Sequence, residues 1–160
     1  DKTIIKGFSG NKMIKITWIK PTSKSDILKY YLILTQKPDF IEIYSFEDNR
    51  ELPEHIINNL FNDNKYSVSL ISKNKMGVSE ISNIETIIPN ENNNFNVDID
   101  KNTYDNSLQN YYDDSNNTGI DLRKQKSIYE KHSIINDLKS VINGQLKFSK
   151  PIGAYNINVY

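Results

Sequence analysis

Apolar and polar residues alternate along several short segments in the first half of the chain. Between Tyr66 and Leu70 the aromatic and aliphatic residues occupy every second position, and serines lie between them. A period of two is typical of a strand with one buried face. Because Leu60 and a short polar stretch precede this segment, the sequence predicts a half-buried strand that the chain enters through a corner.

Similar patterns predict further strands. We expect them at residues 3–7, 13–18, 27–36, 40–46, 66–73 and 78–88. Trp18 shares its alternation phase with two isoleucines and is predicted to point inward. The segment 27–36 is apolar on both faces, which predicts a strand at the centre of a sheet or covered on both sides. Residues 51–59 fit either a strand or a helical turn, and we favour a strand because Leu60 must be reached from an extended segment.

The many short strands and turn signals favour an antiparallel sandwich. Four motifs in residues 1–89 together resemble those of a fibronectin type III domain. They are Trp18 with Pro21, then Ile27 with Tyr30 and Leu32, then Leu60 with Tyr66, and finally Asn74 with Gly77, Ser79 and Ser82. Asn62 departs from the pattern, since that family usually has proline there. The resemblance implies a mostly β fold, an antiparallel seven-stranded β-sandwich.

The expected core of this sandwich contains Trp18, Tyr30, Leu32, Leu60, Tyr66 and Val68. Tyr66 is the most informative of them. A tyrosine that buries its ring still needs a hydrogen-bond partner for its hydroxyl, and a tyrosine corner provides backbone a few residues upstream. The sequence therefore predicts a hydrogen bond between Tyr66 and the corner.

The second half of the chain is organised differently. Residues 90–120 are rich in Asn and Asp without a hydrophobic period, which predicts an acidic linker. Residues 122–143 show helical periodicity, with Asp121 as the expected N-cap and Gly144 as the expected terminator. Residues 121–160 would thus hold one α-helix and a C-terminal strand. That strand either begins another repeat or pairs with an edge of the first domain.

Composition argues against several kinds of chemistry. The chain has no cysteine and zero formal net charge, and its two histidines, His55 and His132, are isolated. No phosphate-binding glycine loop or nucleophile elbow is present. We expect no enzyme activity, no cofactor and no metal site. Lysine, asparagine and isoleucine are abundant, as expected for an AT-rich, apicomplexan-like genome.

Membranes and nucleic acids are also unexpected partners. No apolar run is long enough to span a bilayer, so we expect no membrane insertion. The basic face of the predicted helix is interrupted by Glu130 and Asp137, so we expect no nucleic acid. The compartment stays unknown: the domain family slightly favours a secreted or cell-surface protein, and a cytoplasmic one stays open.

The preferred function is a non-enzymatic protein–protein interaction or adhesion module of a larger protein. The resemblance implies binding through loops or sheet edges. The candidate binding residues are Lys73, Asn74, Lys75, Met76, Gly77, Thr22, Ser23, Lys24 and Ser25. One alternative is a structural spacer or assembly element that docks or self-associates through the helix 122–143. A weaker one is a ligand- or carbohydrate-binding accessory domain of an enzyme.

Overall fold

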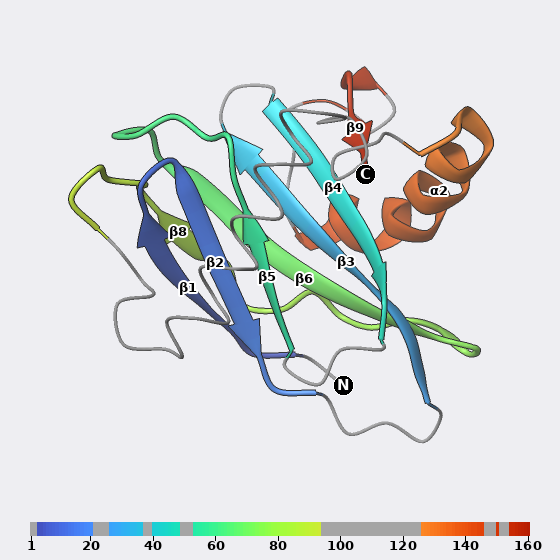
Figure 1. The fold of residues 1–160 in the computed structure, drawn as a ribbon. Coiled ribbons are helices and arrows are strands. Elements are labelled where there is room, and N and C mark those ends of the chain that lie inside the picture. Colours follow the sequence, from blue (N-terminus) through green and yellow to red (C-terminus); the bar gives the residue numbers. More distant parts are fainter. Residues whose placement is uncertain are drawn as a thin grey trace.

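The computed structural model describes residues 3–20, 26–36, 40–48, 53–93, 126–145, 150 and 154–160. These residues form two β-sheets packed face to face and one helix that lies against the larger sheet (Figure 1). The elements are, in chain order, β1 (Ile5–Gly10), β2 (Met13–Trp18), β3 (Ile27–Gln36), β4 (Phe40–Glu47), β5 (Glu54–Ile57), β6 (Tyr66–Asn74), β7 (Gly77–Val78), β8 (Glu85–Ile87), α2 (Ile128–Gln145) and β9 (Asn158–Val159).

The small sheet has the strand order β1-β2-β5, and the large sheet has the order β7-β6-β3-β4-β9, with β8 also paired to β6. The pairings are antiparallel apart from that between β4 and β9, which is parallel. The predicted sandwich is confirmed, and residues 54–57 form the favoured strand. The C-terminal strand lies on the outer edge of β4.

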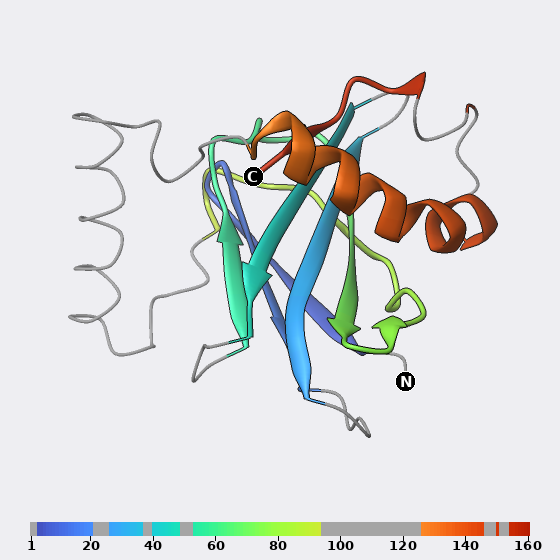
Figure 2. The same cartoon turned by 90° about the vertical axis from the view of Figure 1, so that its right-hand side faces the viewer.

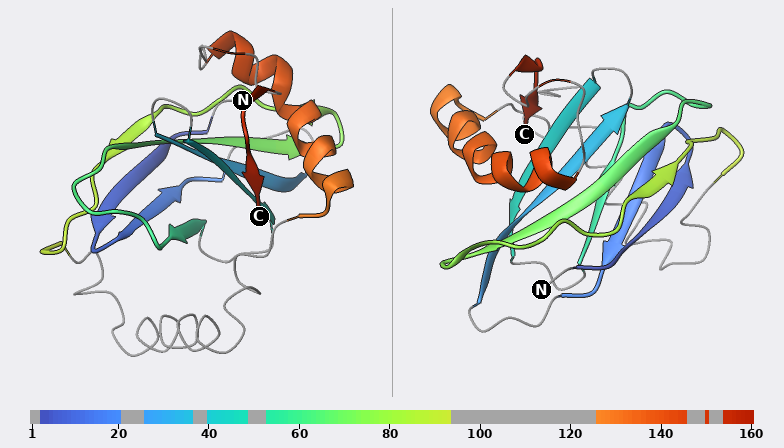
Figure 3. Two further views of the ribbon diagram at one scale, coloured as in Figure 1. Left: turned by 90° about the horizontal axis from the view of Figure 1, so that it is seen from above. Right: turned by 180° about the vertical axis from the view of Figure 1, so that it is seen from behind.

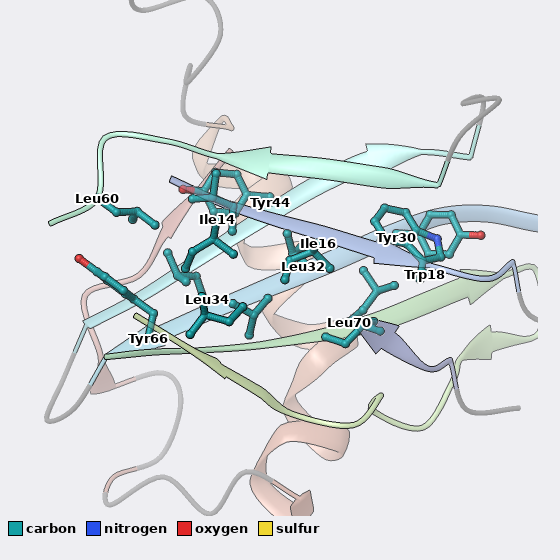
Figure 4. Close-up of a cluster of buried hydrophobic side chains, with 14 of the residues drawn as sticks. Ile14, Ile16, Trp18, Tyr30, Leu32, Leu34, Tyr44, Leu60, Tyr66 and Leu70 are labelled. Atoms are coloured by element: carbon teal, nitrogen blue, oxygen red, sulfur yellow. The ribbon is translucent and has the colours of Figure 1, made fainter. Parts of the chain in front are cut away.

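The main core lies between the two sheets. Trp18 packs its ring against Tyr30, at 5.2 Å between ring centroids (Figure 4). It also packs against Phe46, at 5.6 Å between ring centroids. The side chains expected in the core from the sequence are all buried in this one cluster: Trp18, Tyr30, Leu32, Leu60, Tyr66 and Val68. Trp18 and Tyr30 lie at one end of the sandwich, and Leu60 and Tyr66 lie at the other.

The predicted tyrosine corner is present at that second end. The Phe61 amide donates a hydrogen bond to the Tyr66 hydroxyl at 3.0 Å. The Leu60 amide donates to the carbonyl of Lys12 at 3.0 Å and ties the corner to the turn between β1 and β2. The buried Tyr66 ring therefore keeps its polar atom satisfied, as the sequence required.

Strand β3 is covered on both faces, as predicted. Its residues Tyr30, Leu32 and Leu34 point into the main core. Tyr31 and Ile33 point to the opposite face, into a second core that α2 and the C-terminal residues close. Figures 2 and 3 show α2 crossing that outer face of the large sheet.

The first strand differs from the prediction. It runs over β1 rather than 3–7, because the pairing from Ile5↔Trp18 to Gly10↔Met13 continues past Gly7. A Cβ on Gly7 would lie 2.1 Å from Cδ1 of Ile87. The glycine therefore permits close packing of β8 against β1 and does not end the strand.

The predicted strand 78–88 is interrupted between β7 and β8. Within the gap, Ser79 Oγ accepts a hydrogen bond from the Ser72 amide at 3.0 Å, and Ser82 Oγ accepts one from the Leu70 amide at 2.8 Å. Serine hydroxyls thus replace backbone carbonyls as acceptors for β6. The regular backbone hydrogen-bond pattern between β6 and the following segment is therefore interrupted, but the amides of Leu70 and Ser72 keep an acceptor.

The helix also begins later than predicted. Lys126 and Ser127 are not helical, so α2 starts at Ile128 rather than at residue 122. The Glu130 amide donates to Ser127 Oγ at 3.2 Å, which makes Ser127 the N-cap. Gly144 lies within the helix instead of ending it. Asp121 and most of the predicted linker 90–120 lie outside the described residues.

Candidate interaction surface at the loop end

The loop end is defined here as residues 19–20, 26–28, 48 and 74–77, opposite the tyrosine corner. The register Ile27↔Asn74 places the start of β3 beside the tip of the β6–β7 hairpin (Figure 1). The amide of Asp48 donates to the carbonyl of Leu28 at 3.2 Å, which adds the end of β4 to the same surface. Segments far apart in the sequence therefore meet at the loop end.

An ion pair connects two of these segments. Lys20 Nζ lies 2.7 Å from Asp48 Oδ2, and the hydrogen bond and negative charge of Asp48 raise the pKa of Lys20 above its ordinary value. The lysine is largely exposed, so the pair contributes little to stability. Its effect is to fix a neighbouring positive and negative charge at the rim of the loop end.

The hairpin tip has a defined backbone conformation. Asn74 Oδ1 accepts a hydrogen bond from the Met76 amide at 2.8 Å, and Gly77 adopts a φ of 136° that L side chains rarely take. The cross-strand pairs Lys73↔Val78 and Asn74↔Gly77 close the base of this turn. Lys75 and Met76 are therefore the two turn residues of this hairpin, and Met76 is 80% exposed.

The structure separates the sequence-predicted binding residues into three groups. Asn74, Lys75, Met76 and Gly77 lie together at the tip. Lys73 lies beside them in sequence, but its Nζ contacts Asp137 of α2 at 2.5 Å and so holds the helix instead. Thr22, Ser23, Lys24 and Ser25 lie outside the described residues.

Two exposed apolar residues of the loop end were not among the sequence candidates. Ile19 is 81% exposed and Leu28 is 47% exposed. The signal for Ile19 was present, because a residue that follows an inward-facing tryptophan on a strand points outward. Together with Met76 these residues give the loop end an apolar component beside charged Lys20, Asp48 and Lys75.

A small cavity of about 200 Å³ lies between the start of α2 and the outer face of the large sheet. Each lysine that lines it has an acidic neighbour. Lys29 is the cross-strand partner of Glu47, Lys73 pairs with Asp137, and Lys126 lies 4.0 Å from Glu130. Charged groups of both signs therefore lie in or beside the cavity.

Tyr31, which also lines this cavity, is a structural hydrogen-bond donor. Its hydroxyl donates to Asp137 Oδ2 at 2.8 Å. Burial, together with that hydrogen bond and the charge of Asp137, raises the pKa of Tyr31 far above its ordinary value. The phenol stays protonated, and its proton is committed to holding α2.

Within the part of the chain that the structure describes, no group of three or more His, Asp or Glu side chains could hold a metal ion. No described helix is long and apolar enough to cross a membrane.

The arrangement at the loop end suits contact with another surface, since an exposed apolar anchor beside charged groups is typical of interaction sites.

Comparison with known proteins by sequence finds no matching family model and no matching curated protein. Comparison of structures finds resemblances. A structure described as a myokine has a TM-score of 0.50 and 11% identity, over 57% of this chain and 98% of that chain. The sixth fibronectin type III domain of human fibronectin type III domain containing protein 3 has a TM-score of 0.49 and 13% identity, over 59% and 89%.

The FN5 domain of Drosophila Lar has a TM-score of 0.46 and 17% identity, over 56% of this chain and 95% of that one. At sequence identities this low, the likeness to these structures concerns the fold alone. The strand order of the two sheets and the hydrogen bond of the tyrosine corner define a fibronectin type III fold, with α2 and β9 added to its large sheet.

Proposed function

We propose that this chain is a non-enzymatic protein-interaction module of a larger protein, and that it binds its partner through the loop end. The observation that carries the proposal is the β6–β7 tip, where Met76 is 80% exposed on a turn fixed by Asn74 and Gly77. A pre-ordered turn loses little conformational entropy on binding. Ile19 and Leu28 extend the apolar contact area beyond the tip.

The loop end also has a polar rim. Lys20, Asp48 and Lys75 lie at the same end as the apolar residues, and polar rims around apolar centres are common in protein interfaces. Thr22–Ser25, in the loop between β2 and β3, remain proposed members of the same surface. A partner with an apolar side chain flanked by charges of both signs fits this description.

A photo-crosslinking amino acid at position 76 tests the proposal in extracts of the source cells. A matched probe at Phe61, which is also exposed but lies at the corner end, is the control. We expect one specific protein to be captured from position 76 and not from position 61. Capture of the same proteins from both positions would contradict binding through the loop end.

The captured protein is then purified and titrated against the unlabelled chain. Met76→Asp should weaken binding at least about tenfold, as expected for an interface anchor, and Phe61→Asp should leave the Kd unchanged. Circular dichroism and thermal unfolding confirm that both variants keep the fold. An unchanged Kd for Met76→Asp would overturn the proposed site.

A second candidate function, a structural spacer or assembly element, is favoured by the docking of α2. Ile134 and Leu138 are buried against the large sheet, and β9 extends that sheet beyond β4. The helix is thus a docking element within this chain.

A further inference from the structure

Two buried polar atoms at one end of the main core have no hydrogen-bond partner. They are the indole Nε1 of Trp18 and the hydroxyl of Tyr30, and neither finds a partner in the part of the chain that the structure describes. The two residues are 5% and 1% exposed, so they are shielded from solvent. Buried polar atoms are normally paired, and each exception calls for a physical explanation.

These two atoms are neighbours and face the loop end. The rings of Trp18 and Tyr30 are 5.2 Å apart between centroids. Figure 4 shows the Tyr30 hydroxyl pointing away from Leu60 and Tyr66, which lie at the corner end. Burial raises the pKa of Tyr30, and the adjacent Trp18 indole N–H lowers it by a smaller amount. The phenol stays protonated, so both groups offer a hydrogen to an acceptor.

The Lys20–Asp48 ion pair of the loop end lies next to the two donors. Both charges act on the Tyr30 hydroxyl: Asp48 raises its pKa and Lys20 lowers it. The Asp48 side chain is 11% exposed and the Lys20 side chain is 61% exposed. Because an exposed lysine is held weakly in such a pair, an incoming group displaces it easily. Asp48 then remains as a negative charge beside the donors.

The chemistry of the donors determines the group that they can bind. An indole N–H only donates, a protonated phenol also donates, and one carbonyl oxygen has two lone pairs to accept both hydrogen bonds. A carboxylate would suit the donors but would be repelled by the negative charge of Asp48. We propose that Trp18 and Tyr30 together bind an amide carbonyl oxygen of the partner, supplied by its backbone or by an Asn or Gln side chain.

This inference rests on the proposed function at the loop end and names the polar group that the partner contributes there. An unpaired buried donor is unfavourable in the free chain, so a partner that supplies the acceptor recovers that free energy on binding. A partner without a carbonyl at this point gains nothing from the two donors. The Tyr30 hydroxyl therefore determines specificity, while Met76 supplies apolar contact.

The site can be tested with small amides, because Trp18 is the only tryptophan of the chain and its indole N–H gives a single signal in a proton–nitrogen correlation NMR spectrum. N-methylacetamide represents a backbone carbonyl, acetamide a side-chain amide and acetate a carboxylate. We expect a saturable downfield movement of the indole signal with the amides and not with acetate, and the amide that binds more tightly identifies the source. An unmoved signal, or the same movement with all three compounds, would overturn the inference.

Tyr30→Phe and Tyr66→Phe are a matched pair of variants, since each removes one buried hydroxyl from the main core. The Tyr30 hydroxyl is unpaired in the free chain, so Tyr30→Phe should keep or raise the unfolding midpoint and weaken amide binding about tenfold. The Tyr66 hydroxyl is paired, so Tyr66→Phe should lower the midpoint and leave amide binding unchanged. An equal amide response of Tyr30→Phe and the unmodified chain contradicts a role for this hydroxyl.

The protein captured through position 76 provides a second measurement on the full chain. Its Kd should rise about tenfold with Tyr30→Phe and stay unchanged with Tyr66→Phe. If Met76→Asp weakens this binding while Tyr30→Phe does not, the carbonyl site is overturned and the loop-end function stands. If neither change affects the Kd, both proposals fail.

Discussion

At the scale of single residues, the hydroxyl of Tyr66 makes a contribution that its ring does not. Tyr66→Phe keeps the buried ring but leaves the Phe61 amide without its acceptor. We expect a loss of about 1–3 kcal/mol in the free energy of unfolding. Urea denaturation with an unchanged m-value measures it.

A control for this change is Tyr129→Phe. Tyr129 is exposed on the first turn of α2, so its hydroxyl should have no effect on stability. Equal unfolding midpoints for the unmodified chain and Tyr66→Phe would show that the corner hydrogen bond is not stabilising.

Gly7 gives a second prediction at this scale. A Cβ at this position would overlap the Ile87 side chain, so Gly7→Ala should cost about 1–3 kcal/mol through overpacking. Ile87→Val removes the nearest carbon, Cδ1. The double variant should therefore lose less stability than the sum of the single changes, as a double-mutant cycle measures. Strict additivity would mean that Gly7 is required for another reason.

These two residues show what a sequence can reveal at this scale. Tyr66 was predictable because its neighbours in the chain determine both its burial and the partner of its hydroxyl. Gly7 was not, because the atom that excludes a side chain there belongs to Ile87, far along the chain. The same limit applies to Ser79 and Ser82, whose motif was visible while their hydrogen bonds to β6 were not.

At the scale of elements, the start of α2 depends on Ser127. Ser127→Ala removes the acceptor of the Glu130 amide and should cost about 0.5–2 kcal/mol. Ser127→Asp keeps an acceptor at the helix N-terminus and should retain most of that stability. Thermal unfolding of the three chains, compared at one protein concentration, gives the order. An Asp variant as unstable as the Ala variant would argue against capping.

The helix also shows why its boundary was misplaced. Helical periodicity indicates which residues share a face, but it does not mark the first turn. A better signal was present: Ser127 with Glu130 three positions later is a capping-box pattern. Ile128, the first residue of α2, is exposed although its side chain is apolar, and it does not belong to the buried cluster that contains Ile134 and Leu138.

At the scale of the whole molecule, the sequence predicted that residues 27–36 form a strand at the centre of a sheet or covered on both sides, without identifying a cover. Alternate residues of a strand point to opposite faces, so the apolar residues Tyr31 and Ile33 indicate that the second face of the strand is also buried. This pattern does not show that Ile134 and Leu138 cover that face, because the match between a helix face and a sheet face depends on tertiary packing. The same reason explains why Lys73 was predicted as a binding residue. Its ion pair with Asp137 joins parts of the chain that are far apart in sequence, so the sequence pattern does not reveal it.

Removal of α2 and β9 tests the prediction from the sequence that residues 1–89 form a domain of their own. A chain that ends at Asn93 would expose Tyr31 together with Ile33, Ile43 and Ile71, and each of these isoleucines gains about 1.5–3 kcal/mol from full burial. Large contiguous apolar patches are rare on soluble monomers. We expect the shortened chain to bind a hydrophobic dye, to self-associate and to unfold at lower denaturant concentration than the full chain.

The full chain with Leu138→Ala is the intermediate case, because it keeps the cover but leaves a cavity beneath it. It should lose about 2–5 kcal/mol, whereas Lys139→Ala, on the exposed side of the same turn, should be nearly neutral. If the shortened chain proves monomeric and as stable as the full one, the outer face needs no cover. The fibronectin type III sandwich would then be the complete folding unit, and α2 with β9 would be a dispensable addition to it.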